Sequence, residues 1–394
     1  MNPFANRGIN RLALHIGLAQ FAWCISGVFF GVYLLRQGLP PATIFLTSAA
    51  VLLLRLALRP LILAVVPRLG LKRTLTLGTV VTAVQYPVIG LVSDVGIPLG
   101  AFVALGALAG ILYAPCFHTL FAASGDLERR GSQIGVRQLA IGVAAVLGPL
   151  LGGALLTAYG PFAAFGAASA VNLLAVAPLL GLADVKIARV APPRAFAAGW
   201  SGALLFVSDG WMMCSAAMAW DIVMFRALQS RYDAFGLTLA FAALAGAGCS
   251  LAFGRLIDRG HTRHAQAINA AMLAAAVLAR ALCGTQPAAI VAVAAFAAAV
   301  TVLNAPALMT VFYNEAKLSP CPFRFQFVAE AGWDLGGAGA ALLAAGFSAA
   351  GWPLQAAILL GLFGVALQAK LLAKGYRAQR ARLALAPEPF STGL

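Results

Sequence analysis

The sequence predicts an all-α polytopic membrane protein with twelve transmembrane helices arranged as two six-helix bundles. Of its 394 residues, 62% are hydrophobic and only 10% are charged, whereas about 25% of the residues of a typical soluble domain are charged. The apolar residues fall into long runs with short polar breaks between them. This composition excludes a soluble enzyme, a disordered chain and a disulfide-rich scaffold.

Twelve apolar runs are long enough to span a bilayer, which takes roughly 20 residues in a helix. Gly and Pro are frequent inside these runs, as transmembrane helices tolerate. The first run is too long for the apolar core of a cleavable signal peptide, so we expect it to be retained. In order, the predicted spans are residues 12–35, 42–66, 74–93, 98–123, 134–157, 161–182, 200–225, 235–257, 265–283, 288–314, 324–348 and 352–373.

Lys and Arg residues are distributed unequally between the two ends of these spans. One side carries 19 of the 27, including those of both termini and of residues 184–199, and the other side carries only Arg36, Arg226 and Arg231. The positive-inside rule therefore predicts cytoplasmic termini in a bacterial inner membrane. The basic residues form no continuous face, so we expect the lipid bilayer rather than nucleic acid as the macromolecular surrounding.

The longest polar break, residues 184–199, contains Pro192-Pro193 and divides the chain into two halves. We expect a six-helix bundle in each half, a cytoplasmic linker between them and a cytoplasmic tail. The predicted boundaries are 1–183, 184–199, 200–373 and 374–394.

The two halves also resemble each other in sequence. Residues 112–121 and 303–312 both read L-x-A-P-x-x-x-T-(L/V)-F, and they lie 191 residues apart. The same separation relates Pro67-Arg68 to Asp258-Arg259 in two corresponding loops. A six-helix unit returns the chain to the side where it began, so the sequence predicts parallel repeats about an axis along the membrane normal.

Two motifs add a family resemblance to this duplication. The loop from Gly254 through Asp258 and Arg259 to Arg263 is similar to the signature loop G-x-x-x-D-R-x-G-R-K of the major facilitator superfamily. Residues 148–153, GPLLGG, resemble the GPxxGG motif of its antiporter members of the drug and metabolite efflux type. Pro67 replaces the usual acidic residue of the first-half loop.

Four charged residues lie within the second and eleventh spans. Arg55 and Arg59 are one helical turn apart, as are Glu330 and Asp334, so each pair shares a helix face. The resemblance implies that these two helices face each other. We therefore expect a ladder, Arg59 with Glu330 and Arg55 with Asp334, that latches the cytoplasmic side or frees a carboxylate for proton exchange. Separate contacts within each half are the alternative.

The seventh span contains two further carboxylates, Asp209 and Asp221. Charged residues inside a bilayer are costly and commonly functional, so these two, with Glu330 and Asp334, are the candidates for proton coupling. Asp209 lies near the midplane and is alternatively a polar residue bonded to a neighbouring helix. Asp221 is alternatively a gate or rim residue.

The resemblance also implies that the first, fourth, seventh and tenth helices line a substrate cavity. On these helices we expect Gln20, Tyr113, His118, Trp211 and Asn304 to contribute to the cavity, with a buried structural role as the alternative for His118. The resemblance further implies that Arg137 meets Asp258; the alternative is that its side chain extends to the lipid headgroups.

The resemblance implies a secondary transporter that works by alternating access, most simply by proton-coupled export of a small amphiphilic molecule. Proton-symport import of a metabolite, a lipid or lysolipid flippase and a non-transporting receptor are the alternatives. The six cysteines show no CxxC spacing, and no GxxxxGK(S/T) loop or nucleophile motif occurs. We therefore expect a monomer with no metal, no cofactor and no enzymatic activity, whose partners are a small molecule and protons.

Overall fold

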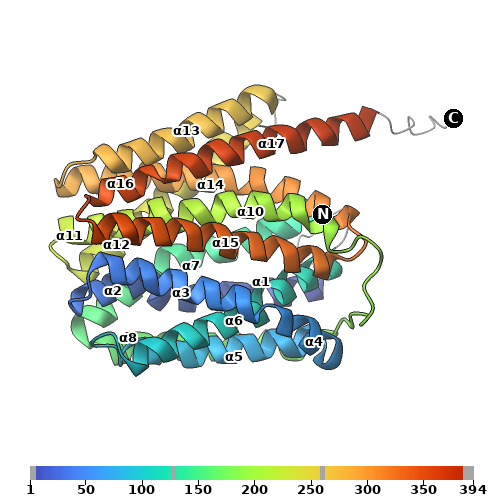
Figure 1. Cartoon of the computed structure of the whole chain (residues 1–394), viewed down its shortest axis with the longest axis horizontal. Helices are drawn as coiled ribbons and strands as arrows, with labels where there is room; N and C mark the ends of the chain where they lie inside the picture. Colours follow the sequence, from blue (N-terminus) through green and yellow to red (C-terminus); the bar gives the residue numbers. More distant parts are fainter. Residues whose placement is uncertain (1–5, 126–129, 258–261, 385–394) are drawn as a thin grey trace.

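The computed structural model describes residues 6–125, 130–257 and 262–384, and the helices of these residues run along one common axis (Figure 1). The first half comprises α1 (Arg7–Ser26), the 3-10 turn Gly27–Phe29, α2 (Phe30–Arg36), α3 (Pro41–Leu58), α4 (Pro60–Leu69), α5 (Leu71–Ile89), α6 (Ile97–Ser124), α7 (Arg130–Ala158), α8 (Pro161–Leu174) and α9 (Ala177–Leu180). The second half comprises the 3-10 turn Ala197–Gly199, α10 (Trp200–Met212), the π-helical turn Met213–Ala217, α11 (Met218–Ala227), α12 (Tyr232–Ile257), α13 (Thr262–Leu282), α14 (Pro287–Leu318), α15 (Pro322–Ala349), α16 (Leu354–Leu359) and α17 (Gly361–Ala384).

These elements confirm the twelve predicted spans. Five spans are interrupted: the first is α1 with α2, the second α3 with α4, the sixth α8 with α9, the seventh α10 with α11, and the twelfth α16 with α17. In the second span Pro60 follows Arg59 directly, and a proline removes a backbone donor from the helix. In the seventh span the five-residue π-helical turn makes the interruption.

Nine helical segments in the described part of the chain are long and apolar enough to cross a bilayer. The other three predicted spans are α5, α13 and α15. Helix α15 carries Arg324, Glu330 and Asp334, all of which are buried against other helices. A spanning helix can hold such residues because they face protein rather than lipid.

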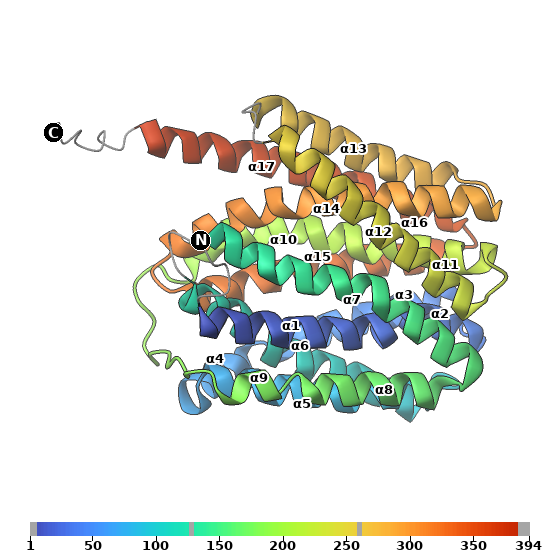
Figure 2. The ribbon, with the colours of Figure 1, turned by 180° about the vertical axis from the view of Figure 1, so that it is seen from behind.

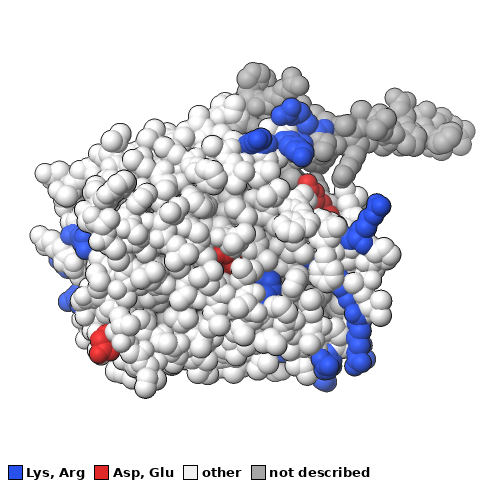
Figure 3. Space-filling model, in the orientation of Figure 1, with Lys and Arg blue, Asp and Glu red and all other residues white. Residues whose placement is uncertain are grey.

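The duplication seen in the sequence is repeated in the helix boundaries. Helices α3, α5, α6, α7 and α8 have counterparts in the second half that begin 190–193 residues later; from Pro41 to Tyr232 and from Leu71 to Thr262 the separation is 191 residues. Figure 1 shows the N-terminal end, the connection between the halves and the end of α17 at one end of the molecule. Lys and Arg side chains gather mainly at that same end (Figure 3).

The two halves pack together mainly through α3 against α15 and through α7 against α12; the second pair is seen from behind in Figure 2. The GPLLGG segment of α7 lies at this second contact. A Cβ atom on Gly152 would lie 2.2 Å from the backbone oxygen of Ile25 in α1, and one on Gly153 would lie 2.6 Å from that of Tyr232 in α12. These glycines therefore let α7 approach the backbones of two helices at once.

Candidate functional site

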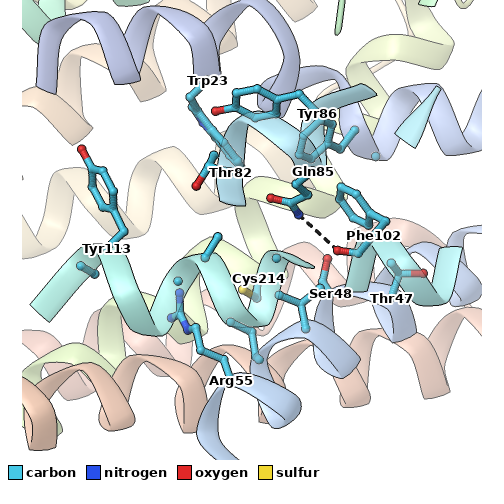
Figure 4. Close-up of a pocket in the computed structure, with 18 of the residues that line it drawn as sticks. Trp23, Thr47, Ser48, Arg55, Thr82, Gln85, Tyr86, Phe102, Tyr113 and Cys214 are labelled. Atoms are coloured by element: carbon cyan, nitrogen blue, oxygen red, sulfur yellow. Dashed lines mark hydrogen bonds between the residues drawn. The ribbon is translucent and has the colours of Figure 1, made fainter. Parts of the chain in front are cut away.

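A cavity of ≈ 430 Å³ lies between helices of the first half and is closed by Met218 of α11, Cys214 of the π-helical turn and Trp333 of α15. This volume falls within the range of small-molecule sites, about 300–1,000 Å³. Its walls combine aromatic rings with a few polar side chains, several of which are shown in Figure 4. The polar and aromatic lining residues include Gln20, Trp23, Phe30, Thr47, Ser48, Arg55, Thr82, Gln85, Tyr86, Phe102, Tyr113 and Asn172.

A buried charge cluster adjoins this cavity and joins the two halves. Nε of Arg55 donates to Oδ1 of Asp334, and Nη2 of Arg59 donates to Oδ2 of the same carboxylate. The side chain of Asp334 is 0% exposed, that of Arg59 is 3% exposed and that of Arg55 is 14% exposed. Both guanidinium groups, from the second span, therefore share a single carboxylate from α15.

The pair of Arg55 with Asp334 is thus present, whereas the expected pair of Arg59 with Glu330 is wrong. Helical side chains lean toward the N-terminus of their own helix. Helices α3 and α15 begin at opposite ends of the molecule, so Arg59 and Asp334 lean toward each other. Glu330 leans away from both, toward the start of α15.

Two other buried carboxylates lie close to this cluster. The structure records no hydrogen bond or ion pair between Glu330 and any described residue, although Glu330 lies in the electrostatic field of Arg55 and Arg59. Asp209 of α10 accepts a hydrogen bond from Nε1 of Trp333 at 3.2 Å. The guanidinium carbon of Arg55 lies 5.1 Å from the centre of the same indole ring, so Trp333 connects Asp209 to the cluster.

Asp221 lies outside the cavity lining. It is on α11, where it interacts electrostatically with Arg280 of α13. Asp221 is thus associated with a residue of its own half and takes no part in the cluster around Asp334.

The expected cavity residues divide into two groups. Gln20 and Tyr113 line the cavity, whereas three others turn to neighbouring helices. Nδ1 of His118 lies 3.0 Å from the hydroxyl of Tyr313, Nε1 of Trp211 donates to the backbone oxygen of Leu360, and Asn304 accepts from Asn269. His118, Trp211 and Asn304 therefore do not line this cavity, because each occupies a face of its helix that packs against another helix; for His118 this agrees with the alternative, a structural role.

Several lining residues were missed by the sequence analysis. Thr47, Ser48 and Gln85 are uncharged and therefore give little signal within an apolar run. Thr47, Val51 and Arg55 are spaced four residues apart on α3, so they share one face of the helix. Residues one and two turns before Arg55 on the same helix face, Val51 and Thr47, could therefore have been predicted to line the cavity.

The signature loop is described only in part. Asp258 and Arg259 lie outside the described residues, as does the side chain of Arg263, whereas Gly254 belongs to α12. Arg137 is described: its guanidinium carbon lies 5.8 Å and 5.9 Å from the ring centres of Phe117 and Phe121. Its expected contact with Asp258 stays a prediction.

The model of the family described as "Major Facilitator Superfamily" matches residues 12–320 of this sequence. The chain belongs to the Major Facilitator Superfamily. No curated protein matches the sequence significantly.

Two solved structures have the same fold as this facilitator. One is the nucleoside transporter NupG, with a TM-score of 0.62 and 12% identity over 93% of this chain and 99% of that one. The other is a bacterial homologue of the iron transporter ferroportin in an inward-facing state, with a TM-score of 0.64 and 16% identity over 94% and 98% of the two chains. Family and fold therefore indicate a multi-pass secondary transporter of small molecules rather than an enzyme.

Proposed function

We propose that this facilitator moves a small amphiphilic molecule by alternating access in exchange for protons, exporting it across a bacterial inner membrane with both termini in the cytoplasm. The observation that carries the proposal is the amphiphilic cavity beside a buried charge cluster. Aromatic walls suit an apolar body, and the few polar groups suit a single polar head.

Asp209 and Glu330 are the proposed proton carriers. Each is a carboxylate within a spanning helix, and neither forms an ion pair with a described residue. Intramembrane carboxylates of this kind commonly form proton relays. Because Trp333 contacts both Asp209 and Arg55 and also lines the cavity, substrate occupancy and the state of Asp209 can influence each other through one side chain.

The proposed gate is the shared carboxylate Asp334. The six-helix units 1–183 and 200–373 would rock against each other, and the second span and α15 belong to different units. Opening between them requires Asp334 to leave both Arg55 and Arg59. The cost of leaving these groups unpaired in a buried site would hold the gate closed until substrate or protons compensate.

Proton-symport import is the second candidate, and one observation favours it. The charged side chain at the cavity wall is a cation, Arg55. An anionic substrate bound there would be stabilised further if Glu330 were neutralised by a proton, so proton and substrate would load together. The resemblance of GPLLGG to an antiporter motif favours export.

Sealed proteoliposomes with an imposed pH gradient and an internal pH-sensitive dye test this proposal. We expect addition of a transported amphiphile to change the rate at which the gradient collapses, and we expect the Asp209→Asn variant to lose this effect. Inward proton movement that accompanies outward substrate movement supports exchange, and parallel movement supports symport. Substrate movement without any proton movement contradicts both.

A further inference from the structure

We propose that the substrate is an organic anion with one charged head group, a carboxylate or its equivalent, which Arg55 binds in the cavity. This inference rests on the proposed function only in taking the cavity as the substrate site. It adds the chemical class of the ligand and the group that recognises it.

The charge that reaches the cavity is positive. Among the described residues that line it, Arg55 is the one with a formal charge at neutral pH. Its partner Asp334 is fully buried behind it and is shared with Arg59. Arg55, Arg59 and Asp334 together carry a net charge of +1 while the neighbouring carboxyl groups of Glu330 and Asp209 are protonated, and a bound monoanion then neutralises the cluster.

Arg55 also has hydrogen-bonding capacity to spare. A guanidinium group has five N–H donors, and here Nε donates to Oδ1 of Asp334. Nη2 is buried and forms an ion pair with the same oxygen of Asp334, whereas the structure records no hydrogen bond from Nη1 to any described residue. The two N–H groups of Nη1 can therefore donate charge-assisted hydrogen bonds to the carboxylate of a ligand.

The side chain of Arg55 is positioned by a glycine on α6. A Cβ atom on Gly110 would lie 2.5 Å from Cδ of Arg55 and 3.0 Å from its Nη1. One turn earlier, a Cβ atom on Gly106 would lie 2.5 Å from Nε2 of Gln85. The bare surface of α6 therefore lets both polar side chains lie flat against the helix at the edge of the cavity.

The rest of the cavity accommodates the apolar part of such an anion. Figure 4 shows Arg55 entering from one side and Trp23, Thr82 and Gln85 from another, with Tyr113 and Phe102 at the two ends of the view. Gln85 donates to the backbone oxygen of Phe102 at 3.3 Å, which fixes its amide. A planar aromatic acid would place its ring between these rings and its carboxylate at Arg55.

This arrangement discriminates between ligands by charge. Hydrogen bonds to a charged acceptor are about twice as strong as neutral ones, so a neutral amide of the same shape would bind at least roughly tenfold more weakly than the acid. An amine would place a second cation against Arg55 in a site of low dielectric constant, where repulsion is strong.

Anion binding would also affect the contact between the two halves. The ligand competes with Asp334 for the same guanidinium group, so occupancy weakens the link between Arg55 and α15. Arg59 then keeps Asp334 from being left without a partner. The second arginine is thus the feature that allows the first one to exchange its carboxylate for a ligand.

The test uses the purified full-length protein in detergent and matched probes: phenylacetate, phenylacetamide and phenethylamine, with the corresponding naphthyl set. Ligand-induced thermal stabilisation gives an apparent affinity for each probe. We expect acids to bind at least about tenfold more tightly than amides, and amines not to bind. We expect Arg55→Gln to abolish the preference for the acid and Arg55→Lys to retain part of it.

A second variant removes no charge but moves the guanidinium group of Arg55. Gly110→Ala displaces the guanidinium group and should weaken binding of the acids while leaving binding of the amides nearly unchanged. Gly100→Ala on the same helix is its control, because nothing lies within 4 Å of a Cβ atom there. The proposal is overturned if an amide or amine binds as tightly as its acid, if Arg55→Gln retains the preference, or if no acid binds at millimolar concentration.

Failure of this inference can be distinguished from failure of the proposed function. Acid binding that depends on Arg55, without any proton-linked transport, supports the anion site and contradicts proton coupling. Proton-linked transport of an amine, without acid binding, supports the proposed function and contradicts the anion site.

Discussion

Asp334→Asn tests the shared carboxylate that joins the second span to α15. The substitution keeps the shape of the side chain and removes its charge. Both oxygens of Asp334 contact guanidinium groups, and the side chain is fully buried. The variant therefore leaves Arg55 and Arg59 next to each other without a counter-charge.

The size of the effect follows from burial. Breaking a buried ion pair by removing one partner costs about 3–5 kcal/mol. Arg55 can relax toward the cavity because its side chain is 14% exposed, whereas Arg59, at 3%, cannot, so most of the cost falls on Arg59. The cost applies only while α3 and α15 touch. Since about 1.4 kcal/mol changes a ratio tenfold, we expect the balance to move at least about 100-fold toward conformations in which the halves separate.

Distances between spin labels measure this shift. Labels at cysteines introduced at Leu69 and Leu318, which are 41% and 66% exposed, report on one end of each half in a background without native cysteines. Asp221→Asn is the matched control, because it makes the same change at a carboxylate of the second half that lies outside the cavity lining and the cluster around Asp334. An equal shift in both variants, or an unchanged distance distribution in Asp334→Asn, refutes the reasoning.

Three further predictions concern coupling, packing and topology. Asp209→Asn should abolish transport driven by a pH gradient while substrate exchange continues, because the amide resembles the protonated carboxyl; undiminished gradient-driven transport would exclude Asp209 as the proton carrier. Gly152→Leu should lower the thermal stability of the protein, since overpacking typically costs about 1–3 kcal/mol and the added Cβ atom would lie 2.2 Å from a backbone oxygen; Gly142→Leu on the same helix, with nothing within 4 Å, is the control, and equal stabilities would contradict the prediction. A cysteine at Val190 should resist impermeant labelling of intact cells, and its modification from outside would reverse the proposed orientation.

The twelve spans could be predicted from the sequence because bilayer thickness imposes a length on every apolar run. The interruptions within the spans were harder to predict. Pro60 gives a visible signal for the break after Arg59, whereas the π-helical turn at 213–217 contains neither Gly nor Pro. Such a turn depends on the surrounding packing rather than on local propensity.

The sequence analysis predicted that Arg55, Arg59 and Asp334 belong to one charge cluster. It did not predict that both arginines contact Asp334. One helical turn is 5.4 Å, and an arginine side chain is long enough to reach across that distance. The lean of side chains along two antiparallel helices therefore decides whether Arg59 meets Glu330 or Asp334. The i, i+4 spacing within each helix does not show which residue of the facing helix Arg59 contacts.

The residues that line the cavity could be predicted only in part, for a different reason. Membership of a cavity-lining helix does not say which way a side chain points, and His118, Trp211 and Asn304 each point to another helix. Uncharged residues such as Thr47 and Gln85 line the cavity without standing out from the apolar run. Their role depends on helix rotation, which the tertiary packing sets.

Gradient reversal tests the central claim of secondary transport most directly. Proteoliposomes are loaded with a substrate identified by binding, and its net movement is followed under pH gradients of opposite sign and after an ionophore collapses them. A coupled carrier transfers free energy between two gradients, so we expect the direction of net movement to reverse with the gradient and net accumulation to vanish with the ionophore. Accumulation that continues in one direction regardless of the pH gradient would contradict the account.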